Sequence, residues 1–301
     1  MKANSLSGHQ NPIYAVNAHP HQPLFYSAGN DKGIVEWSLE TLAHQRIFKP
    51  IQHTVYALNV LPEYSFLVAG CNDGTLCFFD INTSKLKHQL KLGSAIFDIQ
   101  FIPSKKELLV STDTGQVSII NPENQELIHQ FQSGNHKVRS LAFHEELNLL
   151  ATVSNDELIR IFNLNDFTLI HQFKGHADGV GSVSFSPDGR FLITGGRDAH
   201  LKIWNVLDWS LQHSFAAHLF AIYKIAFHPN LPYFATASRD KSIKIWRAED
   251  FSLFRNLSID KAREGHLLSV NAICWTLDGK RLLSAGDDKL VKVWEFNPEL
   301  I

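Results

Sequence analysis

Four stretches of the sequence repeat a histidine, a hydroxyl residue, an aspartate and a tryptophan at one fixed spacing. The first three residue types are those of a hydrolase triad, in which a histidine activates a hydroxyl nucleophile and an aspartate orients the histidine. In each stretch the hydroxyl follows the histidine by 18 positions, the aspartate follows it by 22, and the tryptophan follows the aspartate by six. The four sets are His9, Ser27, Asp31 and Trp37; His176, Thr194, Asp198 and Trp204; His218, Thr236, Asp240 and Trp246; and His266, Ser284, Asp288 and Trp294.

The repetition argues against catalysis by these groups. A catalytic triad is a single site, and its nucleophile must be free to attack while it lies beside its base. Here the tryptophan indole, which can only donate, would occupy the hydroxyl. We therefore predict a structural relay in each stretch, running from indole to hydroxyl to imidazole to carboxylate, which pairs buried polar groups and ties strands together. This interpretation assigns no catalytic residue to the chain and predicts that it is not an enzyme.

The relay residues belong to a longer repeat that contains seven copies of a short opening strand. Each copy has the form apolar–x–x–apolar–x–apolar, and the copies cover residues 13–18, 55–60, 96–101, 138–143, 180–185, 222–227 and 270–275. Turns rich in Pro, Asp, Asn and Gly follow the opening strands, and further short strands follow the turns. Short strands at even spacing, with β-branched and aromatic residues, predict an all-β protein.

The pattern resembles the WD-repeat β-propeller family, whose repeats are about 40–45 residues long. The matching residues are Gly8-His9, Gly175-His176, Gly265-His266 and the weaker Ala217-His218, together with the closing aspartates and tryptophans. The resemblance implies a seven-bladed β-propeller with four antiparallel strands per blade, formed as one domain by residues 1–301. The last repeat ends at its third strand, so we expect residues 2–7 to supply the fourth and close the ring, with Leu6 in the place that Phe173 and Phe215 hold elsewhere.

Three of the seven repeats depart from the relay pattern. Repeat two has His53 two positions nearer its aspartate, Ala69 in place of the hydroxyl and Phe79 in place of the tryptophan. Repeat four shows the same shift at His136 and carries Phe162 in place of the tryptophan, and repeat three has no opening histidine. In these blades we expect packing of aliphatic side chains to replace the relay.

Composition and charge narrow the classes of function. The 301 residues carry a formal net charge of −2, and their lysines and arginines are spread through the repeats, which gives no case for direct nucleic-acid binding. The three cysteines are scattered and no phosphate-binding glycine loop stands out, so we expect no metal and no organic cofactor. The chain start lacks a signal peptide's apolar core and no run reaches transmembrane length, which indicates a cytoplasmic protein without a membrane partner. We also expect the propeller to be monomeric.

Two further repeated features are expected to be structural. Histidines recur on the fourth strands at His44, His88, His129, His171 and His213. Because blades radiate from one axis, these side chains are expected to lie far apart in solvent and not to converge on a metal ion. Phe167, Trp209 and Phe251 each follow an aspartate in three equivalent turns, and their repetition favours packing at the turn, with a partner-binding patch on the bottom face as the alternative.

The second residue of each opening strand is expected to point to the mouth of the central channel. These residues are Tyr14, Tyr56, Phe97, Arg139, Gly181, Tyr223 and Asn271. The positions just before the aspartate turns are expected on the same face and are Asn30, Asn72, Thr112, Asn155, Arg197, Arg239 and Asp287. Tyrosine and arginine dominate binding hot spots, and arginine forks suit carboxylates and phosphates.

We therefore predict a site at this mouth for a protein or peptide partner that is acidic or phosphorylated. The candidate residues are Tyr14, Tyr56, Phe97, Lys137, Arg139, Arg197, Tyr223 and Arg239. In the alternative interpretation the tyrosines pack against one another and fill the channel.

The family resemblance implies a non-enzymatic scaffold or adaptor, since WD-repeat proteins mostly serve as assembly platforms. Fold alone does not specify function, and two other interpretations stay open: an enzyme with a nonrepeating polar site in the channel mouth, and a nucleic-acid-associated propeller. The interval from His218 to His266 is longer than the usual interval of about 42 residues. It contains an insertion over residues 258–265, which is expected to be a surface loop on the same face as the aspartate turns.

Overall fold

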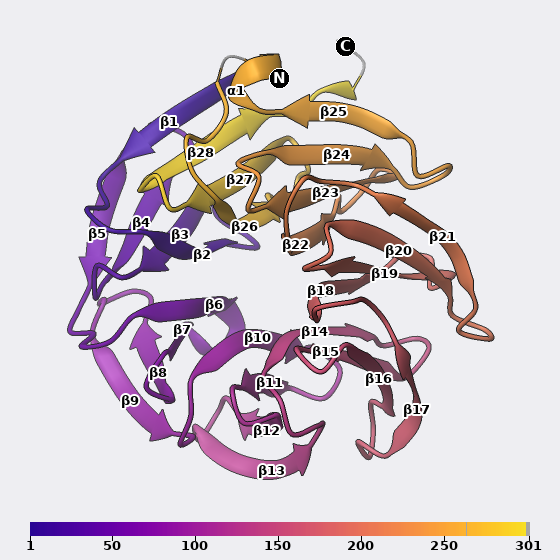
Figure 1. Ribbon diagram of the computed structural model, residues 1–301. Helices are drawn as coiled ribbons and strands as arrows, with labels where there is room; N and C mark the ends of the chain where they lie inside the picture. Colours follow the sequence, from indigo (N-terminus) through magenta and orange to yellow (C-terminus); the bar gives the residue numbers. More distant parts are fainter. Residues whose placement is uncertain (263, 299–301) are drawn as a thin grey trace.

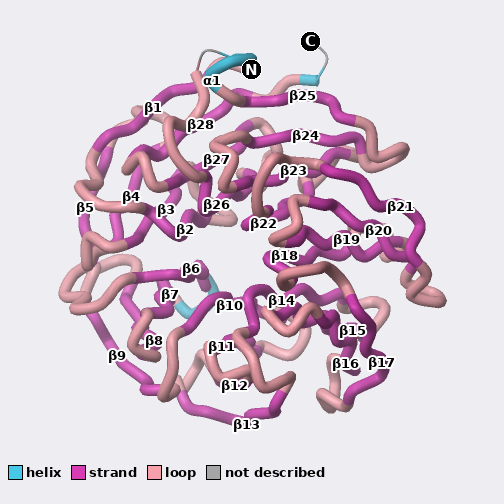
Figure 2. Tube along the Cα trace, viewed as in Figure 1, coloured by secondary structure: helices cyan, strands magenta, loops and turns pink. Residues whose placement is uncertain are grey.

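The computed structural model describes residues 1–262 and 264–298 and shows seven four-stranded antiparallel sheets arranged around a central channel (Figures 1 and 2). This confirms the prediction of an all-β, seven-bladed propeller. Blade one comprises the strands from β2 (Ile13–Ala18) to β5 (His44–Phe48), and blades two to six follow in chain order. Blade seven combines β26 (Val270–Trp275), β27 (Arg281–Gly286) and β28 (Leu290–Glu295) with β1 (Ala3–Ser7).

The strands next to the channel and their first neighbours begin each blade. The inner strands are β2 (Ile13–Ala18), β6 (Val55–Leu61), β10 (Ile96–Ile102), β14 (Val138–His144), β18 (Val180–Phe185), β22 (Ile222–Phe227) and β26 (Val270–Trp275). The second strands are β3 (Leu24–Gly29), β7 (Phe66–Cys71), β11 (Glu107–Thr112), β15 (Leu149–Ser154), β19 (Phe191–Gly196), β23 (Tyr233–Ser238) and β27 (Arg281–Gly286).

The third and outer strands complete the blades. The third strands are β4 (Ile34–Ser38), β8 (Thr75–Asp80), β12 (Gln116–Asn121), β16 (Leu158–Asn163), β20 (His200–Asn205), β24 (Ile243–Arg247) and β28 (Leu290–Glu295). The outer strands are β5 (His44–Phe48), β9 (Leu86–Lys91), β13 (Glu126–Gln132), β17 (Leu169–Lys174), β21 (Leu211–Ala216), β25 (Leu253–Leu257) and β1 (Ala3–Ser7).

The hydrophobic core lies between successive blades. Second and third strands are buried on both faces, because each sheet packs between two neighbours, whereas outer strands such as β17 are largely exposed. In one core cluster Tyr26 and Phe48 of blade one pack with Leu58, Leu67 and Phe79 of blade two. Each blade can therefore bury its apolar faces only by packing against the neighbouring blades, as in other repeat proteins.

The N-terminal strand closes the ring, as predicted. β1 pairs with β28 in antiparallel register from Ala3 opposite Trp294 to Ser7 opposite Leu290. Leu6 lies opposite Val291 and is buried, in the place that Phe173 of β17 and Phe215 of β21 occupy in their own blades. The sheet edge that blade seven would otherwise expose is paired instead with a strand from the other end of the chain.

Within residues 1–262 and 264–298, two short helices interrupt the strands, η1 (Pro62–Tyr64) and α1 (Ile259–Ala262). α1 lies in the insertion between β25 and β26, where the sequence predicted a loop. The backbone N–H of Ala3 donates to Glu264 Oε2 at 2.6 Å, so the insertion is anchored to the closing strand. Arg263, which falls within the insertion over residues 258–265, lies outside the described residues. Neither helix in the described part of the chain is long and apolar enough to cross a bilayer.

Aromatic residues fasten the turns between third and outer strands to the preceding blade. Phe167 and Trp209 occupy left-handed turn positions, with φ near 59°. The Phe167 ring stacks on Phe131, and the Trp209 ring stacks on Phe173. His129 and His171 were expected to be solvated. They stack on the rings of Phe167 and Trp209, respectively, and so add to the contact between blades.

Candidate functional site

The four relays are present as continuous hydrogen-bonded chains. Each indole Nε1 donates to the hydroxyl at 2.7–3.0 Å, each hydroxyl bonds to imidazole Nε2 at 2.7–2.8 Å, and each imidazole Nδ1 bonds to the aspartate at 2.6–3.0 Å. The hydroxyl accepts from the indole, so its own proton points at Nε2. The imidazole proton must then reside on Nδ1 and be donated to the carboxylate. With the hydroxyl fully engaged, these groups hold no free nucleophile.

The relays also position the loops of one face of the ring, which we call the top face. It carries the turns between second and third strands and the loops that join each outer strand to the next inner strand. Asp240 accepts from the backbone N–H of Leu219 at 3.0 Å, and Asp288 accepts from that of Leu267 at 3.0 Å. The residue after each relay histidine is thereby fixed to the aspartate turn of its own blade.

The blades without a relay use other polar contacts. In blade two His53 lies 3.2 Å from Asp73. In blade four the buried Arg160 donates to Asp156 at 2.7 Å. In the same blade the hydroxyls of Ser133 and Thr152 are 2.6 Å apart. This contact replaces the bond that the hydroxyl makes to an imidazole in the relay blades.

Blade three corrects one detail of the repeat alignment. Thr112 was expected at the top face just before the turn aspartate, but it is buried and lies opposite Ile96, as Gly29 lies opposite Ile13. Asp113 holds the top-face position, because its N–H bonds to Ala95 just as the N–H of Asn30 bonds to Pro12. Blade three has no relay histidine and no relay aspartate, so its sequence offers no fixed positions by which to align it with the other blades.

Buried histidines predict a defined pH dependence of stability. Burial lowers the pKa of His9, His19, His176, His218 and His228 from the ordinary value of 6.5. The unfolded chain therefore takes up protons at a higher pH than the folded chain. The stability that these neutral imidazoles allow is fully present above about pH 6.5, and the free energy of unfolding falls as the pH drops below this value. Chemical denaturation at constant ionic strength should give a lower free energy of unfolding at pH 5.5 than at pH 7.5. An unchanged free energy across this interval would contradict the assigned neutral state of these imidazoles.

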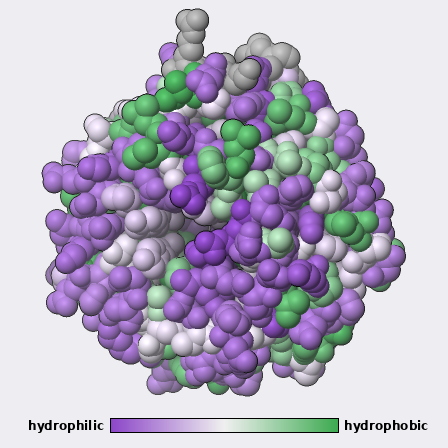
Figure 3. All heavy atoms as spheres, in the orientation of Figure 1, coloured by the Kyte–Doolittle hydropathy of each residue, from purple (hydrophilic) through white to green (hydrophobic). Residues whose placement is uncertain are grey.

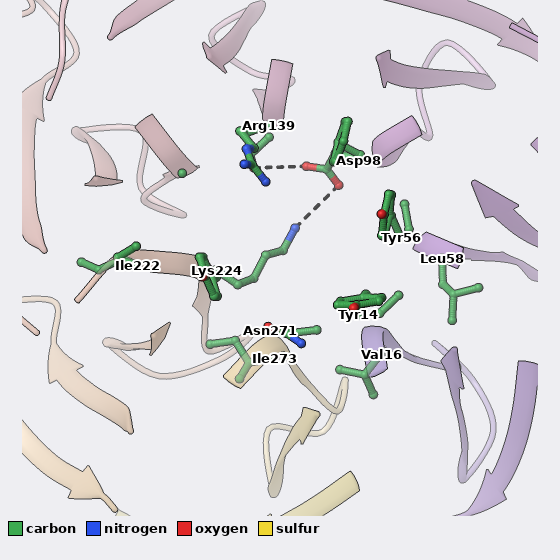
Figure 4. Close-up of a pocket in the computed structure, with 18 of the residues that line it drawn as sticks. Tyr14, Val16, Tyr56, Leu58, Asp98, Arg139, Ile222, Lys224, Asn271 and Ile273 are labelled. Carbon is green, nitrogen blue, oxygen red and sulfur yellow. Dashed lines mark hydrogen bonds and ion pairs between the residues drawn. The ribbon is translucent and has the colours of Figure 1, made fainter. Parts of the chain in front are cut away.

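A bulge in each inner strand builds the channel mouth. Pairing with the second strand shifts after the first residue of every inner strand, which leaves the second residue unpaired. The unpaired residues are Tyr14, Tyr56, Phe97, Arg139, Gly181, Tyr223 and Asn271, and all seven line one cavity of about 990 Å³ (Figure 4). Gly181 leaves a gap in this ring of side chains, because a Cβ there would lie 2.3 Å from the carbonyl oxygen of Ile222.

One wall of the cavity is aromatic. Tyr14 meets Tyr56 edge to face, and Tyr56 stacks on Phe97, each with ring centroids 5.3 Å apart. Lys137 Nζ lies 4.2 Å and Arg139 Cζ lies 5.5 Å from the centroid of Phe97. Tyr14 and Tyr56 thus pack against each other, as the alternative interpretation expected of the tyrosines, but on one side of a channel that retains an open volume.

The opposite wall is cationic. Arg197, Tyr223 and Arg239 line the cavity from blades five and six, and both arginines are exposed at its rim. Arg139 is partly buried, and burial together with the nearby charge of Arg197 lowers its pKa. The structure therefore places all eight predicted partner-binding residues around one cavity.

Sequence reasoning missed two charged residues deeper in the channel. Asp98 of β10 is buried and accepts from Ser140 Oγ at 3.1 Å and Leu141 N at 2.9 Å. Lys224 of β22 reaches across the channel to within 3.6 Å of Asp98 (Figure 4). The sequence does mark both residues, because Asp98 and Lys224 occupy the third position of the opening strand, which is alanine or serine in the other five copies.

Asp98 is also the nonrepeating acid that an active site in the channel would require. Its oxygens accept from Ser140, Leu141, Ile99 and Gln100 and face Lys224, so the carboxylate serves as a link between blades. Among residues 1–262 and 264–298 no group of three or more His, Cys, Asp or Glu side chains is placed to hold a metal ion.

Comparison with known families agrees with this architecture. The family described as "WD domain, G-beta repeat" matches residues 2–38, 44–80, 167–205, 209–247 and 259–295, which together make up more than half of the chain. The "Anaphase-promoting complex subunit 4 WD40 domain" matches residues 90–146. The chain therefore belongs to the WD-repeat family of β-propellers.

Several characterised proteins are similar to parts of this chain. WD repeat-containing protein SL1-17 of Schistosoma mansoni is 27% identical over 161 residues, which is 53% of each protein. Small ribosomal subunit protein RACK1 of Neurospora crassa is 30% identical over 170 residues, 52% of this chain and 53% of that protein. A striatin homolog of Dictyostelium discoideum is 24% identical over 199 residues, 53% of this chain and 24% of that protein. The aligned region thus spans about half the length of the first two relatives.

Proposed function

We propose that this propeller is a non-enzymatic interaction scaffold that binds an acidic or phosphorylated peptide at the top-face mouth of its channel. The observation that carries the proposal is the charge of the cavity. Five cationic residues line it, namely Lys137, Arg139, Arg197, Lys224 and Arg239, although the whole chain has a net charge of −2. A concave site with an excess of one charge attracts ligands of the opposite sign.

The acidic residues of the same cavity offset this charge only in part. Asp98 is engaged by its hydrogen bonds and Lys224. Asp287 accepts from Asn271 Nδ2 at 2.7 Å, and Asp178 lies at the rim. Arg197 and Arg239, in contrast, have no hydrogen-bonded or ion-paired side-chain partner within the described ranges 1–262 and 264–298, so their guanidinium groups are available to a carboxylate or phosphate.

The aromatic wall supplies the second half of the site. Tyr14, Tyr56 and Phe97 present rings to the cavity from three adjacent blades. Rigid aromatic residues beside arginines are the combination that contributes most to binding energy at protein interfaces. The name of one relative, a small ribosomal subunit protein, places it in a larger assembly, which supports a scaffold role for this chain.

The proposal predicts that the double substitution Tyr56→Ala with Arg239→Glu abolishes partner binding while the protein stays folded. Loss of one aromatic anchor and reversal of one charge should each weaken binding by at least about tenfold, the effect expected of hot-spot residues. The measurement is a pull-down with wild type and variant side by side, quantified by mass spectrometry, after both have been shown to unfold at similar denaturant concentrations.

The matched control is Arg190→Glu. Arg190 is a highly exposed arginine in the turn between β18 and β19, at the opposite end of the strands from the top-face turns. This control should keep every partner that wild type captures. A folded double variant that also keeps every partner would refute the site.

A further inference from the structure

The top face carries a second feature that the cavity does not account for, a group of exposed hydrophobic side chains on blades six and seven. Leu219 and Phe220 precede β22 and are 82% and 56% exposed. Leu267 and Leu268 precede β26 and are 62% and 48% exposed. Figure 3 shows hydrophobic residues gathered on this face over these two blades, beside the central hollow. We call these four residues the apolar rim.

The rim is a departure from the repeat. All four residues occupy the two positions that follow a relay histidine, and the equivalent positions of the other two relay blades hold Gln10 with Asn11 and Ala177 with Asp178. The equivalent loops of blades one and five are built without large apolar side chains, so the repeat does not require them at these positions. Contiguous exposed apolar residues surrounded by polar ones mark interaction sites.

The rim is held on a fixed backbone. The N–H groups of Leu219 and Leu267 donate to the buried relay carboxylates of Asp240 and Asp288, both at 3.0 Å. The carbonyl oxygen of Phe220 accepts from Ser238 Oγ at 3.0 Å. A surface that is already ordered loses little conformational freedom when a partner binds, which favours affinity.

The rim adjoins the cationic wall of the cavity. Phe220 lines the cavity, and Arg239 Cζ lies 5.9 Å from the centroid of its ring. The N–H of Arg239 donates to the carbonyl oxygen of Ala221 at 3.0 Å, which fixes the backbone of the arginine beside the rim. A ligand whose anionic group binds Arg239 therefore brings its neighbouring side chains over Phe220 and Leu219.

From this juxtaposition we infer that the partner of the top face is a peptide segment in which an anionic residue is flanked by large apolar side chains. The anion binds Arg197 and Arg239. The apolar flank covers Leu219, Phe220, Leu267 and Leu268. The inference rests on the proposed function and adds the apolar flank to it. A peptide is favoured over an anionic bilayer because part of the site is recessed. A flat headgroup layer would meet the rim but not Arg139, Lys224 and the tyrosines that line the cavity below it.

An oriented peptide library tests the inference. Each library fixes the central residue as phosphoserine, aspartate or asparagine and randomises the flanking positions, and the full chain is immobilised as bait. Wild type should retain the phosphoserine or aspartate library over the asparagine library, which also tells the two anions apart. Among retained peptides, Leu, Ile and Phe should be enriched at flanking positions.

Two variants separate the inference from the proposed function. Leu219→Ser with Leu267→Ser should abolish the apolar enrichment and weaken a selected peptide by about tenfold or more, while the preference for the anion remains. Arg197→Glu with Arg239→Glu should abolish the preference for the anion. Leu277→Ser, which changes a 58% exposed leucine in the turn between β26 and β27, is the matched control and should alter neither.

Each remaining outcome is decisive. Retention of anionic peptides by wild type without apolar enrichment would overturn the inference and leave the proposed function standing. Retention of no library would overturn both. Binding to phosphatidylserine vesicles, or self-association seen by light scattering, would overturn the inference if Leu219→Ser with Leu267→Ser removed it, because the rim would then serve a membrane or a second copy.

Discussion

Replacing Asp240 with alanine should lower the free energy of unfolding by about 1–3 kcal/mol, the usual cost of leaving buried donors without an acceptor. The carboxylate accepts from His218 Nδ1, from the backbone N–H of Leu219 and from both the N–H and the hydroxyl of Ser242. Its side chain is only 4% exposed, so water cannot replace these bonds without local opening. Chemical denaturation of the variant and wild type measures the difference.

Two comparisons make this prediction specific to the relay. Asp31 makes the same contact with His9, but its side chain is 18% exposed, so Asp31→Ala should cost less than Asp240→Ala. Thr114→Ala changes the equivalent turn position in blade three, where no imidazole is present, and should be nearly neutral. Equal losses from the substitutions at 240 and 114 would show that the relay contributes nothing beyond an ordinary turn contact.

Replacing Leu6 with alanine should destabilise the ring by about 2–3 kcal/mol, at the lower end of the range for buried leucines, since an outer strand can partly relax into the space. Leu6 is 8% exposed and packs in a cluster with Ile13, Trp37 and Val291. Because β1 is the only part of blade seven that comes from the start of the chain, its loosening weakens the closure itself.

The control for the closure is Ser7→Ala, an exposed residue of the same strand that should change stability little. Deleting residues 3–7 should exceed the effect of Leu6→Ala, because it also removes the backbone pairing with β28. A melting temperature that is unchanged by the deletion would mean that β1 does not stabilise the ring.

Features that recur along the chain could be predicted from the sequence alone. The relay spacing, the opening strands and the missing final strand each follow from comparing one copy with six others, and Leu6 could be placed by that comparison. The channel-facing role of Tyr14, Tyr56 and Tyr223 also followed from position, although its cause, a bulge at the second residue of each inner strand, is a property of the backbone that the pattern does not reveal.

Features that occur once were harder to predict. Asp98 and Lys224 come from blades three and six, and only the curvature of the ring brings them within 3.6 Å. Arg160 and Asp156 form an ion pair in a blade where the sequence indicated aliphatic packing alone. Thr112 was placed one residue out of register because blade three lacks both the histidine and the relay aspartate that mark the others. In each case the information lies in contacts between elements, not in the spacing within one.

The register of the closing strand determines how the ring responds to mechanical force. Ala3 lies opposite Trp294 and Ser7 opposite Leu290, so the start of β1 and the end of β28 meet at the same edge. Tension applied between segments attached at these two ends acts on the pair Ala3 and Trp294 first and breaks the pairs one after another, as a zipper opens. A force that instead pulled the strands past each other would have to break all five pairs together. Tethers at the two ends therefore pull the propeller open along its weakest direction, at blade seven, whereas a partner bound across the top face spreads its pull over several blades.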